Sequence, residues 1–347
     1  MNLKKIVIPS PGGYEKLLTQ SFPDLQANDH SIVVDVKGIG VNYADCLVRF
    51  GVYESAKKYV GWPITPGFEF SGIVKAIGKD VTKFKIGEEV VGITLFNAYA
   101  TQVNVKENQL FHIPSGFSLI EAAGFATVFF TAYHALFQLV KIYPGSHVLV
   151  HSAAGGVGSA LVQLAKAFNF KVTGVVGASH KIQDVKNLGA DFVIDKSSQD
   201  LWNEAKKVCP EGYDAIFDAN GYTTLKEGYN HLRAVGKIIS YGAHSLMPRG
   251  GSGRVNYFKA LIGLIKSPRF SPLQLITDNK SVIGFNLSFL FARQDLALEA
   301  MTDLMRLAQD KKIKPLKTTT FKFSEVGKAH QALESGTTVG KIVLVVD

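Results

Sequence analysis

The stretch that decides the fold of this chain is His-Val-Leu-Val-His-Ser-Ala-Ala-Gly-Gly-Val-Gly, residues 147–158. Its first residues are apolar and β-branched, which is typical of a buried strand, and the glycines that follow predict a tight turn. From Ser159 to Phe168, apolar residues recur at helical spacing. The sequence therefore predicts a strand, a tight turn and a helix in direct succession.

The glycine-rich turn has the pattern of an anion-binding site. Such a turn directs backbone N–H groups and the positive end of a helix dipole at one point, which suits a pyrophosphate. Small residues occupy the three key positions of the Gly-x-Gly-x-x-Gly pattern, with alanine in place of the first glycine. A turn that binds nothing is the alternative, but the strand before it and the helix after it favour a dinucleotide site. We therefore expect the whole turn to contact the cofactor, namely Ala153, Ala154, Gly155, Gly156, Val157 and Gly158.

The composition is that of a globular protein with two domains. A chain of 347 residues is too long for one ordinary hydrophobic core, and it contains 46% hydrophobic and 19% charged residues. The net charge of +9 favours anionic ligands. The lysines are scattered and accompany no nucleic-acid-binding motif, so we expect no nucleic-acid partner.

Cysteine usage and the first residues predict a cytoplasmic protein. Cys46 and Cys209 cannot form a disulfide framework, and the chain opens without the pattern of a signal peptide. The most apolar window, residues 122–140, contains Thr127, Thr131 and His134, which favours a buried helix over a membrane span.

The chain changes its pattern near residue 121. Residues 4–110 contain short β-like runs separated by glycine and proline, which predict a compact antiparallel β domain. Within them, residues 42–51 fit a loop and one helical turn. Beyond residue 121, strands alternate with helices, as in a parallel sheet covered on both faces. The strands expected after the first are residues 171–176, 192–194, 214–217, 237–242 and 281–285.

The last part of the chain returns to the β domain. After an amphipathic helix over residues 295–310, strands are expected over 315–323 and 341–346. Between them lies a helix over 325–333, with Ser324 as its N-cap and Gly336 just after its end. We therefore predict a β domain over residues 1–122, completed by 311–347, and a doubly wound parallel-sheet domain over 123–310.

Residues 244–272 are rich in glycine, serine, proline and basic residues. Within them, residues 255–266 predict a mostly apolar helix with a narrow polar stripe that includes Lys259 and Lys266. Three interpretations remain open: a helix packed on the body of the protein, a lid over cofactor or substrate, and a peripheral membrane contact.

The end of the second strand of the parallel sheet predicts which dinucleotide is bound. NAD sites place an Asp or Glu there, about 20 residues after the glycines, to hold the ribose 2′-hydroxyl. Here the strand is followed by Gly177-Ala178-Ser179-His180-Lys181, without a carboxylate. Ser179 and Lys181 fit a 2′-phosphate, and Lys196, just past the third strand, adds a second cation. The sequence therefore predicts NADPH.

Motifs along essentially the whole chain give it a resemblance to a known family. They are the turn with Gln163-Leu164-Ala165-Lys166, Gly40-Val41-Asn42-Tyr43-Ala44-Asp45, Pro66-Gly67-Phe68-Glu69, Gly189-Ala190-Asp191 and Gly340-Lys341-Ile342-Val343-Leu344. With them the chain resembles the zinc-independent quinone oxidoreductase branch of the medium-chain dehydrogenase/reductase superfamily. Residues 65–72, 221–225 and 284–287 are most similar to its VAT-1-like subgroup.

The resemblance implies a GroES-like β domain built from both chain ends, a Rossmann domain between them and NADPH in the cleft. It also implies a homodimer paired through the edge strand 281–285. Metal-dependent members carry Cys where this chain has Asn42 and His where it has Phe68, so we expect no metal. Without a metal, the acceptor must be intrinsically electrophilic, a condition that quinones and α,β-unsaturated carbonyls meet.

The resemblance also implies roles for individual residues. Asn42 and Tyr53 line the substrate side of the nicotinamide, and Thr131 lies beneath its ring. Tyr53 either donates a hydrogen bond to the developing oxyanion or only packs at the domain junction, and Asp45 is interpreted as a helix-cap or loop anchor. Ligands bind at the carboxyl ends of the strands in open α/β sheets. Further cofactor contacts are therefore expected at Asn220, Tyr241, Gly242, Ala243, Phe285, Asn286 and Leu287, and in the C-terminal motif at Lys341.

Two functions remain as hypotheses. The first is an NADPH-dependent, zinc-independent reductase that transfers hydride to quinones or α,β-unsaturated carbonyls. The alternative is a VAT-1-like, membrane- or lipid-associated protein whose nucleotide site is vestigial or regulatory. The intact glycine turn favours the enzyme, and the basic stretch 255–266 favours the alternative.

Overall fold

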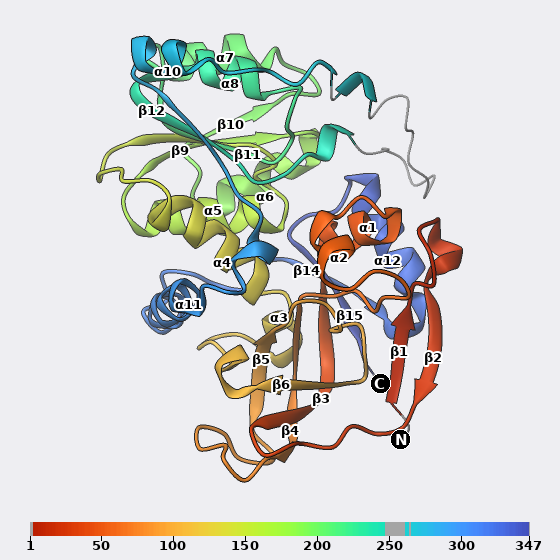
Figure 1. Ribbon diagram of the computed structural model, residues 1–347. Coiled ribbons are helices and arrows are strands. Elements are labelled where there is room, and N and C mark those ends of the chain that lie inside the picture. The colour runs from red at the N-terminus through yellow and green to blue at the C-terminus, as the bar shows by residue number, and fades with distance from the viewer. Residues whose placement is uncertain (1–2, 247–260, 264, 347) are drawn as a thin grey trace. The chain divides into compact units, whose positions relative to one another are not determined.

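The computed structural model describes residues 3–246, 261–263 and 265–346, which form two compact units (Figure 1). Of the described residues, the first unit contains those up to 130 and those from 288 onward. The second unit contains residues 131–246 and those from 261 to 287. Helix α11 (Gln294–Gln309), expected in the parallel-sheet domain, groups with the first unit, which begins again at residue 288 rather than at 311.

A seven-stranded sheet organises the first unit, as the short β-like runs predicted. All its strand pairs are antiparallel except the one between its first two members. Its order is β14 (Thr318–Lys322), β15 (Lys341–Val345), β3 (Ser31–Val41), β4 (Glu69–Ile77), β5 (Glu89–Ile93) and β7 (Leu110–His112), with β6 (Gln102–Lys106) also on β3. Strands β1 (Leu3–Val7) and β2 (Leu18–Phe22) form a separate pair. Since β15 pairs with β3, both parts of the chain build one sheet, as the predicted GroES-like architecture requires.

Helices in the first unit differ from the expectation at two points. Residues 43–50 form a full helix, α1 (Tyr43–Phe50), because the Asp45 carboxylate accepts from the backbone N–H of Asn42 at 2.8 Å and stabilises the first turn. Ser324 is not the N-cap of α12 (Val326–Ser335), because a 3₁₀ turn, η7 (Phe323–Glu325), precedes that helix. The other helical elements are η1 (Tyr14–Lys16), α2 (Glu54–Tyr59), η2 (Glu107–Gln109), α3 (Leu119–Ala122) and η6 (Leu287–Leu290); α4 (Ala126–Tyr133) begins here.

Six parallel strands form the sheet of the second unit. Their order is β10 (Phe192–Asp195), β9 (Lys171–Val176), β8 (His147–Val150), β11 (Tyr213–Asp218), β12 (Leu232–Ser240) and β13 (Ser281–Gly284). Counted along the chain, this order is 3-2-1-4-5-6, the Rossmann arrangement, which confirms the predicted fold class. The arrangement reverses its direction between β8 and β11, where ligands of such folds bind.

Helices cover both faces of this parallel sheet (Figure 1). One face carries α7 (Leu201–Val208), α8 (Leu225–Asn230) and α10 (Pro272–Asp278), and the other carries α5 (Gly156–Ala167) and α6 (Ile182–Asn187). The unit also contains η3 (His134–Gln138), η4 (Ser179–Lys181) and η5 (His244–Leu246). Strand β12 ends at Ser240 and β13 at Gly284, so Tyr241 and Phe285 begin the loops that follow them.

Much of the unusual segment 244–272 lies outside the described residues, and this includes Lys259 and most of the expected helix 255–266. Residues 261–263 and 265 are helical. The apolar window 122–140 folds into α4 and the π-helical η3. Within the described residues, we find no helix with the length and apolar character that a membrane crossing requires.

Candidate functional site

Two of the three glycines in the turn of the second unit, Gly155 and Gly158, differ in the space around them. A Cβ on Gly158 would lie 2.2 Å from the Ser152 carbonyl oxygen and 2.8 Å from the Ala153 Cα, so the packing of α5 against the turn requires glycine. A Cβ on Gly155 would meet only the Ser152 oxygen, at 3.3 Å. Gly155 also has an ordinary φ of −83°, so the backbone conformation does not demand glycine there, and a side chain is far less crowded than at Gly158. An open face at the start of a twelve-residue helix is what close approach of a phosphate requires.

Three side chains that follow three neighbouring strands of the same sheet carry buried polar atoms without a hydrogen-bond partner. They are His151 after β8, with both ring nitrogens, Asn220 after β11, with its Nδ2, and Tyr241 after β12, with its hydroxyl. Buried polar atoms in native proteins are nearly always hydrogen-bonded, so three orphaned groups at one sheet edge indicate a missing polar ligand. The residues at this edge therefore fit a dinucleotide.

His151 lies at the point where the strand order reverses. It is fully buried, and its Nε2 lies 3.8 Å from Oδ2 of Asp218. Burial lowers the pKa of His151 to about 4, so the ring is neutral. The Asp218 carboxylate accepts from the backbone N–H groups of Asn220 and Gly221 at 2.8 and 2.7 Å and from the Thr224 hydroxyl at 2.5 Å. These bonds fix the loop after β11.

The corner where β9 and β10 end contains a carboxylate, contrary to the expectation from the sequence. Asp195, the last residue of β10, pairs in register with Val176 of β9, and its Oδ2 accepts from the Ser179 hydroxyl at 2.6 Å. The acid comes from the third strand, whereas the sequence argument considered only the end of the second. The Phe192–Asp195 run itself was the available signal, since parallel strands end at one edge.

Two lysines also belong to this corner. Lys181 lies at the end of η4 and is 9% exposed, and burial lowers its pKa. Lys196 donates its backbone N–H to the Val176 carbonyl at 3.1 Å, and its Cε lies 3.7 Å from the point where Gly177 would carry a Cβ. The structure therefore brings Ser179, Lys196 and the end of β9 together, as the sequence predicted.

The remaining cofactor candidates of the second unit lie near the ends of β12 and β13. The Phe285 ring packs on His134 and Tyr241, with centroid distances of 4.8 and 6.2 Å. Gly242 has no room for a side chain, because a Cβ would lie 2.6 Å from the Ala219 carbonyl oxygen. Ala243, Asn286 and Leu287 are half-buried, and Thr131 is buried in α4.

In the first unit, Asn42 belongs to a buried ion-paired cluster. The Lys341 ammonium contacts Asn42 Oδ1 at 2.6 Å, Glu69 Oε1 at 2.7 Å and the Val41 carbonyl at 2.9 Å. Asn42 Nδ2 donates to Glu69 Oε1 at 2.9 Å, and Glu69 Oε2 accepts from the Thr127 N–H at 2.8 Å. All three ammonium hydrogens of Lys341 are thus engaged inside this unit. The predicted cofactor contact of Lys341 would require one of these bonds to break.

Tyr53, the second catalytic candidate, is half-buried and precedes α2. Its ring packs edge-on against Phe68 with centroids 5.7 Å apart, and Phe68 packs on Phe96 at 5.2 Å. Asn42 and Tyr53 therefore both lie in the first unit, whereas the glycine turn belongs to the second.

The residues at the positions where metal-dependent relatives hold zinc do not fit this metal. Asn42 supplies an amide and Phe68 an apolar ring, in place of thiolate and imidazole. The Lys341 ammonium already supplies a positive charge between Asn42 and Glu69. A divalent cation there would be repelled by this ammonium.

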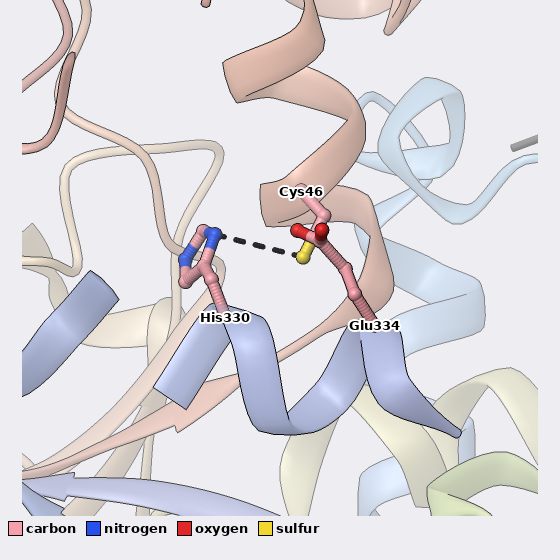
Figure 2. Close-up of side chains that lie close together, drawn as sticks. All are labelled: Cys46, His330 and Glu334. Carbon is pink, nitrogen blue, oxygen red and sulfur yellow. Dashed lines mark hydrogen bonds between the residues drawn. The ribbon is translucent and has the colours of Figure 1, made fainter. Parts of the chain in front are cut away.

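One group of three metal-ligand types lies elsewhere among the described residues. Figure 2 shows Cys46 of α1 facing His330 and Glu334 of α12, with Cys46 Sγ 3.5 Å from His330 Nδ1. The sequence argument missed this group; its signal was the spacing of four between His330, in the predicted helix 325–333, and Glu334, which directly follows it. Glu334 forms a buried ion pair with Arg49 and accepts from the Tyr14 hydroxyl at 2.7 Å. Both of its oxygens are thus engaged, and Arg49 opposes a cation, so the group does not fit a metal site.

Cys46 and His330 belong to a buried hydrogen-bond network that continues through Tyr99 to Asp45, and the directions of its bonds follow from Asp45. Asp45 accepts from the N–H groups of Asn42 and Gly67, so it accepts from Tyr99 as well, at 3.1 Å. Burial raises the pKa of Asp45 to about 7, against the effect of these donors. Since the Tyr99 proton points to Asp45, His330 Nε2 donates to the Tyr99 oxygen at 3.1 Å and the Cys46 thiol donates to Nδ1. The network ties α12 to the loop that carries Asn42.

Comparison with known proteins agrees with this geometry. Residues 28–142 match the alcohol dehydrogenase GroES-like domain family, and residues 188–344 match the zinc-binding dehydrogenase family. A synaptic vesicle membrane protein VAT-1 homolog from Danio rerio is 34% identical over 348 residues, which covers 99% of this chain and 70% of the relative.

Solved structures of VAT-1-like and quinone oxidoreductase proteins are also similar to this chain. The crystal structure of human synaptic vesicle membrane protein VAT-1 homolog-like protein has a TM-score of 0.84 at 30% identity and covers 100% of this chain and 99% of its own. Escherichia coli quinone oxidoreductase complexed with NADPH has a TM-score of 0.84 at 26% identity, covering 99% of both chains. By these matches, the chain belongs to the VAT-1-like proteins of the medium-chain dehydrogenase/reductase superfamily, a superfamily of oxidoreductases.

Proposed function

We propose that this protein binds NADPH at the carboxyl edge of its parallel sheet and reduces quinones or α,β-unsaturated carbonyls without a metal. The observations that carry the proposal are the orphaned polar groups of His151, Asn220 and Tyr241, which follow β8, β11 and β12, and the Gly155 turn, which also follows β8. The NADPH complex of the similar quinone oxidoreductase supports the choice of cofactor.

The chain's own residues bind and orient in this proposal. When bound, NADPH supplies a hydride from its nicotinamide C4. The N–H groups at the start of α5 hold the pyrophosphate, and Ala154, Gly156 and Val157 contribute backbone rather than side chains. Asn42 and Tyr53 contact the acceptor, with Tyr53 donating to its oxygen. Lys341 acts as a positioning residue that holds the Asn42 amide through the 2.6 Å contact, in place of the predicted cofactor contact.

A substrate panel tests the proposed activity. Purified protein should oxidise NADPH in the presence of quinones or enones, and metal analysis of the same preparation should find no stoichiometric zinc. Thermal protection by NADPH provides an independent measure of binding. Protection without turnover on any acceptor would overturn the proposed reaction and leave the nucleotide site standing.

Lys181→Ala should weaken NADPH binding at least about tenfold and NADH binding about twofold or less, because a lost cation affects mainly the ligand with the extra phosphate. The measurement is the dissociation constant of each nucleotide by protein fluorescence. Lys186→Ala, an exposed lysine on the neighbouring helix α6, is the matched control and should change neither. Equal losses for both nucleotides would contradict the 2′-phosphate assignment.

A second candidate function is lipid association with a regulatory or vestigial nucleotide site. It is favoured by the exposed apolar side chains of Leu261 and Ile265, 54% and 72% exposed, next to Lys266, and by the membrane-protein names of the relatives. Flotation with phosphatidylserine vesicles tests it, with Lys259→Glu/Lys266→Glu as the comparison. If wild-type protein stays unbound, this candidate is eliminated; binding lost in the charge-reversed variant supports it.

We further propose a cytoplasmic homodimer. In the described chain, β13 pairs on one side only, with β12, and α10 just before it exposes Leu273 and Ile276 at 75% and 76%. An edge strand beside exposed apolar residues suits a second copy of the chain. Light scattering coupled to size exclusion should give twice the 37.7 kDa chain mass, and a monomer mass would reject the dimer.

A further inference from the structure

The corner formed by the ends of β9 and β10 contains an acid that a 2′-phosphate does not need. The Asp195 side chain is 1% exposed, yet hydrogen bonds from Ser179 and Ser197 lower its pKa to about 2. It therefore carries a full negative charge at every pH near neutrality. Its place is fixed by the register with Val176, the last residue of β9.

Hydrogen-bond directions at Asp195 are unambiguous. Oδ1 accepts from the backbone N–H and the hydroxyl of Ser197, at 2.9 and 2.6 Å. Oδ2 accepts from the Ser179 hydroxyl at 2.6 Å. An ionised carboxylate only accepts, so the single hydroxyl hydrogen of Ser179 is directed at Asp195. A phosphate likewise only accepts, so Ser179 cannot donate to one while this bond exists.

We propose that Asp195 is a specificity-determining residue that limits the preference for NADPH, so that the protein also binds NADH. The carboxylate repels a 2′-phosphate and withholds the Ser179 hydroxyl from it, whereas a ribose 2′-hydroxyl carries no charge for it to repel. Lys181 and Lys196 act in the opposite direction, toward the phosphate. The inference rests on the proposed nucleotide site and deepens it.

Asp195→Asn isolates this effect, because it keeps the shape of the side chain. The amide oxygen still accepts from Ser197, and the amide NH₂ can donate to the Ser179 oxygen, which frees the Ser179 hydrogen for a phosphate. We expect NADPH to bind about tenfold more tightly and NADH to bind no more tightly than in wild type.

Dissociation constants for NADPH, NADH and 2′,5′-ADP, measured by calorimetry, test the proposal. Asp191→Asn is the matched control, because it removes the same charge just before the other end of β10, about 13 Å away at 3.3 Å per residue. Its NADH-to-NADPH ratio of dissociation constants should stay within about twofold of wild type. Ser179→Ala is a second variant, and it should weaken NADPH about twofold or less, since the hydroxyl does not donate to the phosphate.

Three results would overturn the proposal: an unchanged ratio in Asp195→Asn, a ratio that moves toward NADH, or a tenfold loss of NADPH in Ser179→Ala. The failure of the proposed function looks different. If neither nucleotide nor 2′,5′-ADP binds the wild type, the proposed nucleotide site is rejected, and this inference is rejected with it. Binding with an unaltered ratio rejects only the role of Asp195.

Discussion

Glu334→Ala is expected to lower the free energy of unfolding by about 3–5 kcal/mol, because it leaves the Arg49 guanidinium buried without its counter-charge. Both side chains of this ion pair are almost fully inaccessible, at 0% and 1% exposed. The guanidinium also stacks on the rings of Tyr14 and Phe50, and each ring centroid lies 4.4 Å from the Arg49 Cζ. The guanidinium therefore cannot turn toward water without breaking these contacts. Urea unfolding followed by fluorescence provides the measurement.

Two further variants distinguish the cost of an unpaired buried charge from a general loss of stability in α12. Lys328→Ala breaks an ion pair with Glu325 near the start of the same helix, where the lysine is 70% exposed, and should cost about 0.5 kcal/mol or less. Arg49→Met combined with Glu334→Leu removes both charges and should recover much of the loss. If Glu334→Ala unfolds at the wild-type urea concentration, the ion pair does not hold α1 against α12.

The residues that could be predicted from the sequence are those whose partners are close along the chain. The β8–turn–α5 unit needs only residues 147–168, and the Rossmann order follows from alternating strands and helices. In the Cys46–His330–Glu334 group, Cys46 lies more than 280 positions from the other two residues, so the local His330–Glu334 spacing does not reveal the cysteine that faces them. Lys341 was recognised by its motif, but its partner Glu69 belongs to β4, far earlier in the chain, and the two meet only because β15 and β4 both pair with β3.

Asp195 shows a second reason why a site residue can be missed in a sequence. Its strand was predicted nearly to the residue, and its chemistry is plain in the sequence. The error came from assigning the adenosine corner to one strand. Parallel pairing places the ends of β9 and β10 side by side, so a carboxylate absent from one strand can be supplied by its neighbour.

Substitutions of Gly155 and Gly158 in the turn should separate nucleotide binding from folding. Gly158→Ala is expected to destabilise the protein by about 3 kcal/mol or more, because its Cβ would overlap the backbone oxygen of Ser152 at 2.2 Å. Gly155→Ala should cost only about 1 kcal/mol, the usual penalty for alanine at an N-cap. The same variant should weaken NADPH binding about 100-fold, since the methyl group stands where the phosphate approaches.

Thermal melting and calorimetric titration of the two variants, with Gly284→Ala as a control, provide the measurements. A Cβ on Gly284, at the end of β13, would meet only the Ser240 oxygen at 3.8 Å, so this control should fold as wild type. Wild-type NADPH affinity in Gly155→Ala would show that the turn does not receive the pyrophosphate. The comparison is decisive because the two methyl groups lie three positions apart in one turn, and only the one at Gly158 would come within 3 Å of backbone atoms.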